Sequence, residues 1–236
     1  MADPNRWFNA EHVAAWNADP GRNNPTRAEQ VDILAELAAA AWTPGTAMID
    51  LACGTGHVIE TICERCPEAR VVALDYSPQV LETARQRLAL LGDAISFVEA
   101  DLTALASAAL PEETYSVAIS VQSFHHFQDD EKARQVAAIH DHLAPGGVLL
   151  VQDRFEVPGP GLYDLYQTLW RRQRRIHQVD VNDETLPDLT APPDPMGEKA
   201  AALPWFLDLL RDAGFEAACL HLHGTRGLVA ARKPHH

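Results

Sequence analysis

Short apolar runs alternate with segments of helical periodicity along most of the chain. The apolar runs predict strands at about 46–52, 70–75, 95–99, 115–121 and 148–155. Between them, apolar residues recur at intervals of three and four, which predicts helices at about 57–66, 78–91 and 129–142. Apolar strands that alternate with helices are typical of a parallel sheet covered on both faces. We therefore expect an α/β fold.

Helices are also expected ahead of the first strand. Thr26 and Glu29 have the spacing of a capping box, and the apolar residues that follow them recur with helical spacing. A shorter amphipathic helix is expected at about 7–16. We interpret residues 1–45 as an N-terminal helical cap on a core that spans 46–155.

Residues 156–199 interrupt this pattern with many prolines and one expected helix at about 161–177. The apolar residues on one side of that helix are Leu162, Leu165, Leu169 and Ile176. An acidic, proline-rich loop follows. Because ligands bind beyond the carboxyl ends of parallel strands, we interpret 156–199 as a lid over the substrate. Residues 200–233 predict a helix and a two-stranded hairpin, and the whole chain, 1–236, is expected to form one domain.

Charge, hydrophobicity and cysteine content disfavour several classes of protein. The formal net charge is −14, and an acidic surface repels phosphate backbones, so nucleic acid is disfavoured as a partner. No run of about 18 apolar residues occurs, and the N-terminus lacks the basic and apolar segments of a secretory signal. Cys63 and Cys66 form a single pair without the further ligands of a zinc site. We expect a cytoplasmic protein with no membrane span and no metal.

The segment Met48–His57 combines a buried strand with a glycine-rich turn. Gly54 and Gly56 let a ligand approach the backbone closely, because no Cβ stands in the way. Asp75 follows about 20 residues later at the end of the second strand, where a carboxylate accepts hydrogen bonds from ribose hydroxyls. The pattern predicts a nucleoside site at the first junction of strand, turn and helix.

Two departures from the pattern of a dinucleotide site reduce the number of ligand classes that fit. Ile59 stands where a Gly-x-Gly-x-x-Gly pattern would place its third glycine. Asp50, on the strand before the turn, would repel a pyrophosphate but suits an ammonium or sulfonium centre. S-adenosylmethionine is a nucleoside with such a tail. The alternatives are a nicotinamide site and an ordinary glycine turn in which Asp75 caps the next helix.

The segment Asp50–Gly56 resembles motif I of the class I S-adenosylmethionine-dependent methyltransferases. Asp75 matches the ribose-binding acid of that family, and Glu99–Leu102 resembles its adenine-contacting segment. Tyr115–Val121 resembles the fourth strand, and Leu143–Leu150 the turn and fifth strand. The likeness covers the core and the terminal helix and hairpin. It implies a Rossmann-like, doubly wound, seven-stranded sheet in the order 3-2-1-4-5-7-6, with the last strand antiparallel.

The resemblance implies S-adenosylmethionine as the cofactor. The cofactor-binding residues that we expect are Trp16, Asp50, Ala52, Cys53, Gly54, Gly56, Asp75, Tyr76, Asp101, Leu102 and Val121. Asp75 would hold the ribose and the segment with Asp101 the adenine. Asp50 and the backbone of Val121 would orient the amino acid end. Trp16 is included because an aromatic face attracts a cation such as the sulfonium.

Methyl transfer needs an aligned nucleophile and, for a protonated acceptor, a base. His125 and His126 follow the fourth strand, in a loop that borders the methionine tail in this fold, and one of them is predicted to be the base. The alternative is a histidine that only positions the loop. Further candidates for the substrate side are Asp153, Tyr163, Tyr166, His177, Trp7 and His12.

We expect methyl transfer to a small molecule of specialised metabolism, by a monomer or homodimer. One alternative keeps the cofactor site but promotes another reaction, such as a cyclisation, and a second is a non-catalytic partner subunit. Binding motifs do not report turnover, so both alternatives share these residues. A third is RNA modification, which Arg171–Arg175 keeps open and the net charge disfavours.

Overall fold

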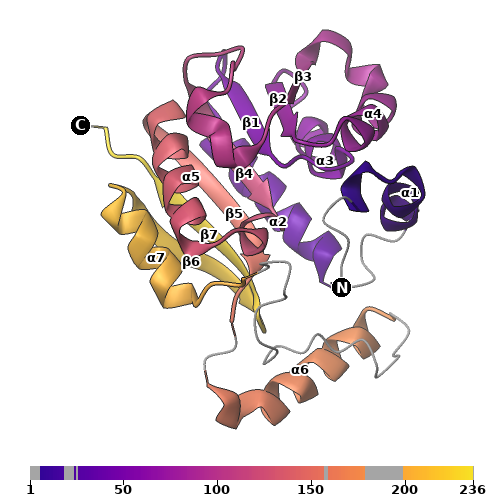
Figure 1. Cartoon of the computed structure of the whole chain (residues 1–236), viewed down its shortest axis with the longest axis vertical. Coiled ribbons are helices and arrows are strands. Elements are labelled where there is room, and N and C mark those ends of the chain that lie inside the picture. The colour runs from indigo at the N-terminus through magenta and orange to yellow at the C-terminus, as the bar shows by residue number, and fades with distance from the viewer. Residues whose placement is uncertain (1–5, 19–23, 25, 157–158, 179–198, 236) are drawn as a thin grey trace.

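Seven strands form one sheet in the order β3-β2-β1-β4-β5-β7-β6 (Figure 1). The computed structural model describes residues 6–18, 24, 26–156, 159–178 and 199–235. The strands are β1 (Ala47–Leu51), β2 (Arg70–Asp75), β3 (Ile95–Glu99), β4 (Tyr115–Val121), β5 (Leu143–Arg154), β6 (Glu216–His223) and β7 (Arg226–Arg232). All pairings among β1 to β5 are parallel, and β7 is antiparallel to both of its neighbours. The predicted Rossmann-like, doubly wound fold is therefore confirmed.

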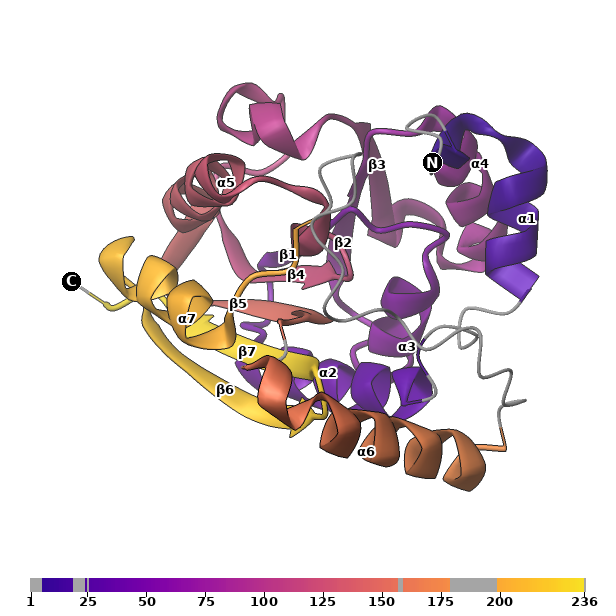
Figure 2. The same ribbon diagram turned by 60° about the horizontal axis from the view of Figure 1, so that its bottom comes forward.

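Helices cover both faces of the sheet (Figures 1 and 2). The α-helices are α1 (Ala10–Ala18), α2 (Arg27–Ala41), α3 (His57–Arg65), α4 (Pro78–Arg87), α5 (Asp129–His142), α6 (Tyr163–Ile176) and α7 (Leu203–Asp212). Single 3-10 segments are η1 (Arg6–Phe8), η2 (Ala89–Ala94), η3 (Leu102–Ser107), η4 (Phe124–His126) and η5 (Pro160–Leu162). Residues of α2 and α3 form the core on one face, and residues of η3, α5 and α7 form it on the other.

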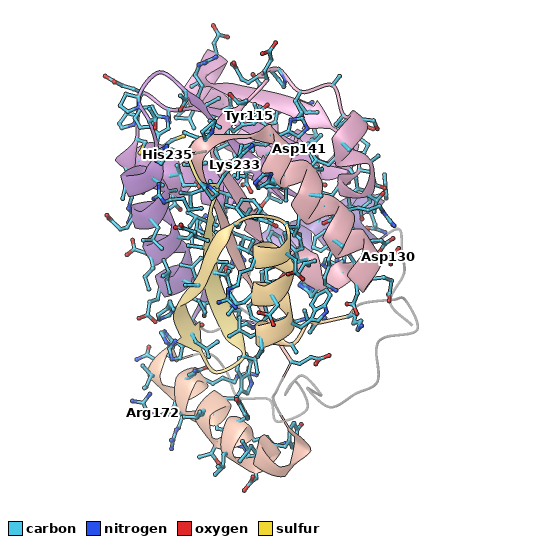
Figure 3. All side chains as sticks on the ribbon, turned by 90° about the vertical axis from the view of Figure 1, so that its left-hand side faces the viewer. Tyr115, Asp130, Asp141, Arg172, Lys233 and His235 are labelled. Atoms are coloured by element: carbon cyan, nitrogen blue, oxygen red, sulfur yellow. The ribbon has the colours of Figure 1, made fainter. Side chains whose placement is uncertain are left out.

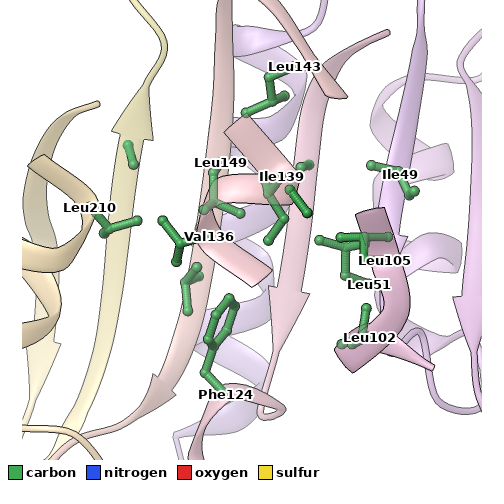
Figure 4. Packing of buried hydrophobic residues seen from close by; sticks show 14 of the residues in the cluster. Ile49, Leu51, Leu102, Leu105, Phe124, Val136, Ile139, Leu143, Leu149 and Leu210 are labelled. Atoms are coloured by element: carbon green, nitrogen blue, oxygen red, sulfur yellow. The ribbon is translucent and has the colours of Figure 1, made fainter. Parts of the chain in front are cut away.

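The central strand β1 is buried along its whole length and sends alternate side chains to the two cores. Ile49 and Leu51 lie in the core that contains Ile139 of α5, which Figure 4 shows together with Leu102 and Leu105. Met48 lies in the opposite core, with the apolar stripe of α2. By the same alternation, Asp50 points to the α2 face. A carboxylate is thus carried into a layer that is otherwise apolar.

Three sequence-based boundaries were wrong. Thr26 and Glu29 form no capping box: the Thr26 hydroxyl donates to Asn24 Oδ1, and no side chain caps α2. A capping box forms at α5, where Glu131 accepts from the backbone of Gln128. The helix expected at 78–91 ends at Arg87 and continues as η2. The fifth strand begins at 143 rather than at about 148, because its first residue already pairs with the start of β4.

Helix α6 forms within the range expected for it, about 161–177. The apolar residues that the sequence places on one side of this segment, Leu162, Leu165, Leu169 and Ile176, are exposed. The opposite side is buried and carries Trp170, Gln173 and Arg174. The acidic, proline-rich loop that we expected after α6 lies outside the described residues, apart from its last position.

The C-terminal segment lies beside the start of β5, at the end of the sheet where the parallel strands begin. Lys233 Nζ donates to the carbonyl of His140 at 2.7 Å and to that of Leu143 at 2.8 Å, and so ties the end of α5 to the C-terminus. Figure 3 shows Lys233 and His235 at the end of the molecule opposite Arg172 of α6. The carboxyl ends of the strands therefore face the α6 side.

Gly56 should be less replaceable than Gly45. Both have positive φ, +81° and +86°, so alanine costs about 1–2 kcal/mol at either position. A Cβ at Gly56 would also lie 2.8 Å from Leu88 Cδ1, whereas a Cβ at Gly45 would have no atom within 4 Å. Overpacking should add about 1–3 kcal/mol to Gly56→Ala alone. Urea denaturation measures both variants, and equal losses would contradict the tight fit at Gly56.

Candidate active site

The turn between β1 and α3 is held in an unusual backbone conformation. Ala52, Gly54 and Gly56 all have positive φ, and Gly56 is the N-cap residue of α3. The backbone N–H of Cys53 donates to the Leu74 carbonyl at 2.9 Å, which fixes the turn against β2. Gln122, directly after β4, is a second non-glycine residue with positive φ. Strain of this kind is concentrated at functional sites, and these two strands are neighbours at the switch point of the sheet.

Asp75 lies directly beside this turn. Its Oδ2 accepts from the backbone N–H of Gly54 at 3.1 Å, and its Oδ1 accepts from that of Ser77 at 3.0 Å. Burial raises the pKa of the Asp75 carboxyl, and these backbone donors oppose the rise. Each oxygen retains a lone pair for a further donor, such as a ribose hydroxyl.

Asp50 is a buried carboxylate whose charge the protein compensates poorly. The residue is 1% exposed, and neither of its oxygens has a hydrogen-bond partner within the described part of the chain. Burial raises the pKa of its carboxyl to about 7, and the negative charge of Asp75 contributes to the rise. Among the described residues, the guanidinium of Arg27 acts in the opposite direction and lowers this pKa. A cationic ligand group would remove this penalty.

Arg27 was missed by sequence analysis. It lies in the first turn of α2, is 7% exposed, and places its Cζ 5.4 Å from the centre of the Trp16 ring. Burial lowers the pKa of its guanidinium, and the charge of Asp50 opposes this. Arg27 stands four residues before Val31, in register with the buried stripe of α2. A charged residue at a core position of a helix is the signal that could have identified it.

Aromatic residues of the N-terminal cap cover the turn. A Cβ at Gly54 would lie 4.0 Å from the Trp16 ring, so this indole sits over the glycine. Trp7 meets Trp16 edge-on at 5.6 Å, and the carbonyl of Trp7 accepts from the Ser77 hydroxyl at 2.6 Å. Tyr76 packs against Phe8 at 5.3 Å. The predicted position of Trp16 near the cofactor turn is consistent with this cover.

The segment after β3 runs beside the same site. The backbone N–H of Ala100 donates to the carbonyl of Asp75 at 3.0 Å. Asp101 is exposed and caps η3, because its Oδ1 accepts from the Thr103 N–H at 2.8 Å. Leu102 is 7% exposed and belongs to the core on the α5 face. The structure therefore brings this segment next to Asp75, as the resemblance implied.

His125 and Asp153 form a buried dyad at the carboxyl ends of β4 and β5. His125 Nδ1 lies 2.6 Å from Asp153 Oδ1, and the His125 backbone N–H donates to Oδ2 at 3.1 Å. Burial lowers the pKa of His125 to about 4, although Asp153 acts to raise it. Burial alone would raise the pKa of Asp153, but His125 lowers it below its ordinary value. A neutral imidazole therefore donates from Nδ1 to a carboxylate, which leaves the Nε2 lone pair available.

The structure distinguishes the two adjacent histidines. The His126 ring lies 4.0 Å from that of His125, measured between centroids, and the contact to Asp153 belongs to His125. The loop is supported by Lys132, which is 1% exposed and donates to the carbonyls of Phe127 and Lys199. Lys199 in turn donates its backbone N–H to the His125 carbonyl at 2.7 Å. Lys132 was also missed, and it too occupies a core position of its helix.

Other candidates fall outside this arrangement. His177 is exposed at the end of α6, and its charge acts on His223 rather than on the dyad. Tyr163 and Tyr166 are half-buried on α6. His12 packs edge-on against Trp7 at 5.1 Å.

No group of three or more histidine, cysteine or acidic side chains among the described residues is placed to hold a metal ion. None of the helices formed by these residues is both long enough and apolar enough to cross a bilayer.

Comparisons with known proteins identify the family. A profile described as a methyltransferase domain matches residues 48–147. A trans-aconitate 2-methyltransferase of Acidovorax ebreus is 30% identical over 184 residues, which cover 74% of this chain and 67% of that protein. The chain belongs to the class I S-adenosylmethionine-dependent methyltransferases.

Other members of this methyltransferase family differ in acceptor. A demethylmenaquinone methyltransferase of Thermus thermophilus is 35% identical over 126 residues, covering 53% of this chain and 54% of that protein. An O-methyltransferase family protein of Burkholderia thailandensis has the same fold, with a TM-score of 0.68 at 19% identity over 97% of this chain and 61% of that one. The chain spans about half the length of several curated relatives that it matches.

The residues of this methyltransferase fit the cofactor of the family, S-adenosylmethionine. Asp50 supports this fit most directly. Its two buried oxygens have no hydrogen-bond partner within the described part of the chain, and the cofactor carries an ammonium group that could bind them. The backbone turn at Gly54 and Gly56 leaves room for a close approach.

Asp50→Asn should stabilise the protein without cofactor. The folded pKa of Asp50, about 7, lies above its ordinary value, so the free energy of unfolding falls as pH rises from about 4 to 7. Removing the charge should raise that free energy by about 1–3 kcal/mol at pH 8, and by less at pH 5. Chemical denaturation at both pH values measures the effect, with the exposed Asp93→Asn as the control. An equal effect at both pH values would show that the pKa of Asp50 is not raised.

Proposed function

We propose that this chain transfers a methyl group from S-adenosylmethionine to a small-molecule acceptor, with His125 as the general base. The observation that carries the proposal is the 2.6 Å contact between His125 Nδ1 and Asp153 Oδ1 at the carboxyl edge that also holds the glycine turn. A base needs a free lone pair, an orienting partner and a place beside the reacting group. His125 has the first two in the structure, and family membership supports the third.

The turn, the two acids and Arg27 would hold the cofactor. Asp75 would accept hydrogen bonds from the ribose hydroxyls, and the exposed Asp101 with Leu102 would border the adenine. The ammonium group would pair with Asp50, whose charge has no other hydrogen-bonding partner in the described chain. Arg27, which interacts electrostatically with Asp50, would bind the carboxylate of the same amino acid end.

The remaining predicted contacts are assigned to the methionine portion, the ribose and the sulfonium of the cofactor. Ala52, Cys53, Gly54 and Gly56 would line the methionine portion, Tyr76 would border the ribose, and the backbone of Val121 would face the amino acid end. Trp16 would cover the sulfonium from the side of the N-terminal cap, a position supported by its place over Gly54.

His125 would take the acceptor proton at Nε2. Asp153 fixes the tautomer by accepting from Nδ1, so Nε2 points its lone pair away from the carboxylate. When bound, S-adenosylmethionine supplies an activated, electrophilic methyl group. Burial lowers the pKa of His125 to about 4, which keeps the imidazole neutral at physiological pH. Asp153 acts through His125 and is a positioning residue.

The acceptor, setting and assembly are also part of the proposal. Relatives named as demethylmenaquinone and trans-aconitate methyltransferases make a quinol and a small polycarboxylate the first acceptors to assay, ahead of other specialised metabolites. The four cysteines are free thiols, a state that a reducing cytoplasm maintains. The net charge of −14 disfavours nucleic acid. We assign one catalytic domain, acting as a monomer or homodimer.

Asp75→Asn should weaken binding of S-adenosylhomocysteine by about 1–3 kcal/mol, because charge-assisted hydrogen bonds to the ribose are lost. The variant also replaces an acceptor of the Gly54 and Ser77 N–H groups, so a structural effect must be separated. Titration calorimetry with the 2′-deoxy analogue makes the separation. Wild type should discriminate against the analogue, and the variant should not. Equal discrimination in both proteins would remove Asp75 from the ribose site.

His125→Asn should lower kcat by about 10²–10⁴-fold without changing the affinity for S-adenosylhomocysteine. Asp153→Asn should also lower kcat, because the amide allows the wrong tautomer. His126→Asn is the neighbour control and should cost far less. Wild-type kcat should fall only as pH decreases toward about 4, where Nε2 becomes protonated. A kcat that tolerates His125→Asn would exclude this base.

A further inference from the structure

Helix α6 and its N-cap residue carry an exposed apolar stripe. Large apolar side chains form this stripe, each between 47% and 57% exposed: Leu162, Leu165, Leu169 and Ile176. The side of the helix that contains Gln173 is buried, and a Cβ at Gly224, between β6 and β7, would lie 3.8 Å from the Gln173 side chain. Figures 1 and 2 show α6 at the margin of the molecule. Apolar surface that continues along one side of a helix is typical of a contact surface.

The spacing of the α6 stripe is that of a helix–helix seam. Steps of three, four and seven residues separate its members, which occupy the first and fourth positions of a heptad. Such positions form a narrow stripe, and a second helix packs against it by inserting its own side chains. Arg172 occupies the remaining fourth position, seven residues after Leu165. A bilayer fits this stripe less well than a helix, because it would bury the charge of Arg172 without a partner.

The charges beside the stripe are arranged by sign along the helix. Asp164 lies in the first turn of α6, whereas Arg172 and Arg175 lie in its last two turns, and all of them are exposed. Two such helices in parallel would place arginines beside arginines. Antiparallel helices would place the acid of each beside the arginines of the other, and their dipoles would also attract. The helix is therefore complementary to an antiparallel copy of itself.

We propose that α6 binds α6 of a second copy of this chain, as an antiparallel helix pair about a two-fold axis. Such an interface is isologous, so one self-complementary surface supplies both of its halves. The middle of the stripe, near Leu169, would lie against its own copy, and each Asp164 would lie near Arg172 or Arg175 of the other helix. The proposed function leaves a monomer and a homodimer open, and this inference does not depend on methyl transfer.

The size of the surface sets the expected strength of the dimer. Helix α6 has 14 residues, which makes it about 21 Å long. Stable interfaces bury about 1,600 Å² in total, which is more than one side of each such helix is expected to provide. We therefore expect a reversible dimer with a Kd in the micromolar range. Because the carboxyl ends of the strands face the α6 side, the dimer would join two molecules next to their candidate sites.

Sedimentation equilibrium of the full chain tests the inference, at concentrations from about 1 to 200 µM and physiological ionic strength. Wild type should change from the mass of a monomer to twice that mass as concentration rises. Leu165→Lys and Leu169→Lys should each weaken association about tenfold or more, because both copies of the leucine lose their burial. These side chains are exposed, so both variants should keep the wild-type melting temperature. A wild type that stays monomeric throughout would overturn the dimer.

Two controls separate this surface from other occupants. Leu220→Lys is the matched variant, because Leu220 is 55% exposed but lies on the edge strand β6, and its mass should follow that of wild type. Dissociation by Leu220→Lys but not by the α6 variants would place the dimer at the sheet edge and overturn the helix pair. Binding of a monomer to phosphatidylglycerol vesicles, lost in Leu165→Lys, would assign the stripe to a membrane surface and also overturn it.

Cross-linking tests the antiparallel orientation. Leu169→Cys should form a covalent dimer with a short bismaleimide, whereas Leu162→Cys alone should not, because the first turns of the two helices would lie far apart. Mixing Leu162→Cys with Ile176→Cys should restore the covalent dimer. Wild type gives the background from the cysteines of the chain, of which Cys219 is partly exposed. Efficient cross-linking of Leu162→Cys alone would show parallel helices and overturn the proposed pair.

Failure of this inference differs from failure of the proposed function. A chain that stays monomeric but binds S-adenosylhomocysteine would lose the helix pair and keep the function. A chain that dimerises through α6 but does not bind S-adenosylhomocysteine would keep the helix pair and lose the function.

Discussion

The rest of the site depends on the burial of a carboxylate at the end of the central strand. Asp50 is carried into the α2 face by the alternation of β1, and its two oxygens have no hydrogen-bond partner in the described chain. The protein tolerates this because Arg27 lies near and because the pKa of Asp50 rises to about 7. A buried acid without a partner lowers stability, so its presence is explained best by a ligand cation.

The strained backbone beside Asp50 is a second local cost to stability at this site. Ala52 and Gln122 directly follow two neighbouring strands, and both have positive φ at the switch point of the sheet. Near the end of the next strand, β5, Asp153 holds His125, which lies in the loop after β4. The ends of the adjacent strands β1, β4 and β5 thus carry the buried carboxylate of Asp50, the glycine turn and the imidazole of His125, which Asp153 orients. The fold places them together because parallel strands end at one edge.

Much of this arrangement follows from local sequence pattern. Strands β2, β3 and β4 begin and end where apolar runs predicted, and the turn at Gly54 and Gly56 adopts the positive φ that glycine allows. Sequence analysis missed Arg27 and Lys132 because the groups that they interact with, Asp50 and the Lys199 carbonyl, are distant in sequence. Periodicity placed the α6 leucines on one side of the helix but did not show that this side is exposed, because it identifies a helical face and not what covers it. The base at His125 stays a proposal, although the contact to Asp153 separates it from His126.

Proton release on cofactor binding tests the central claim most directly. If an ammonium group pairs with Asp50, a carboxyl with a pKa of about 7 must become fully ionised when the ligand binds. Calorimetry of S-adenosylhomocysteine binding at pH 7, in two buffers of different ionisation enthalpy, should show release of a fraction of a proton. Binding with no proton release would contradict the role given to this carboxylate.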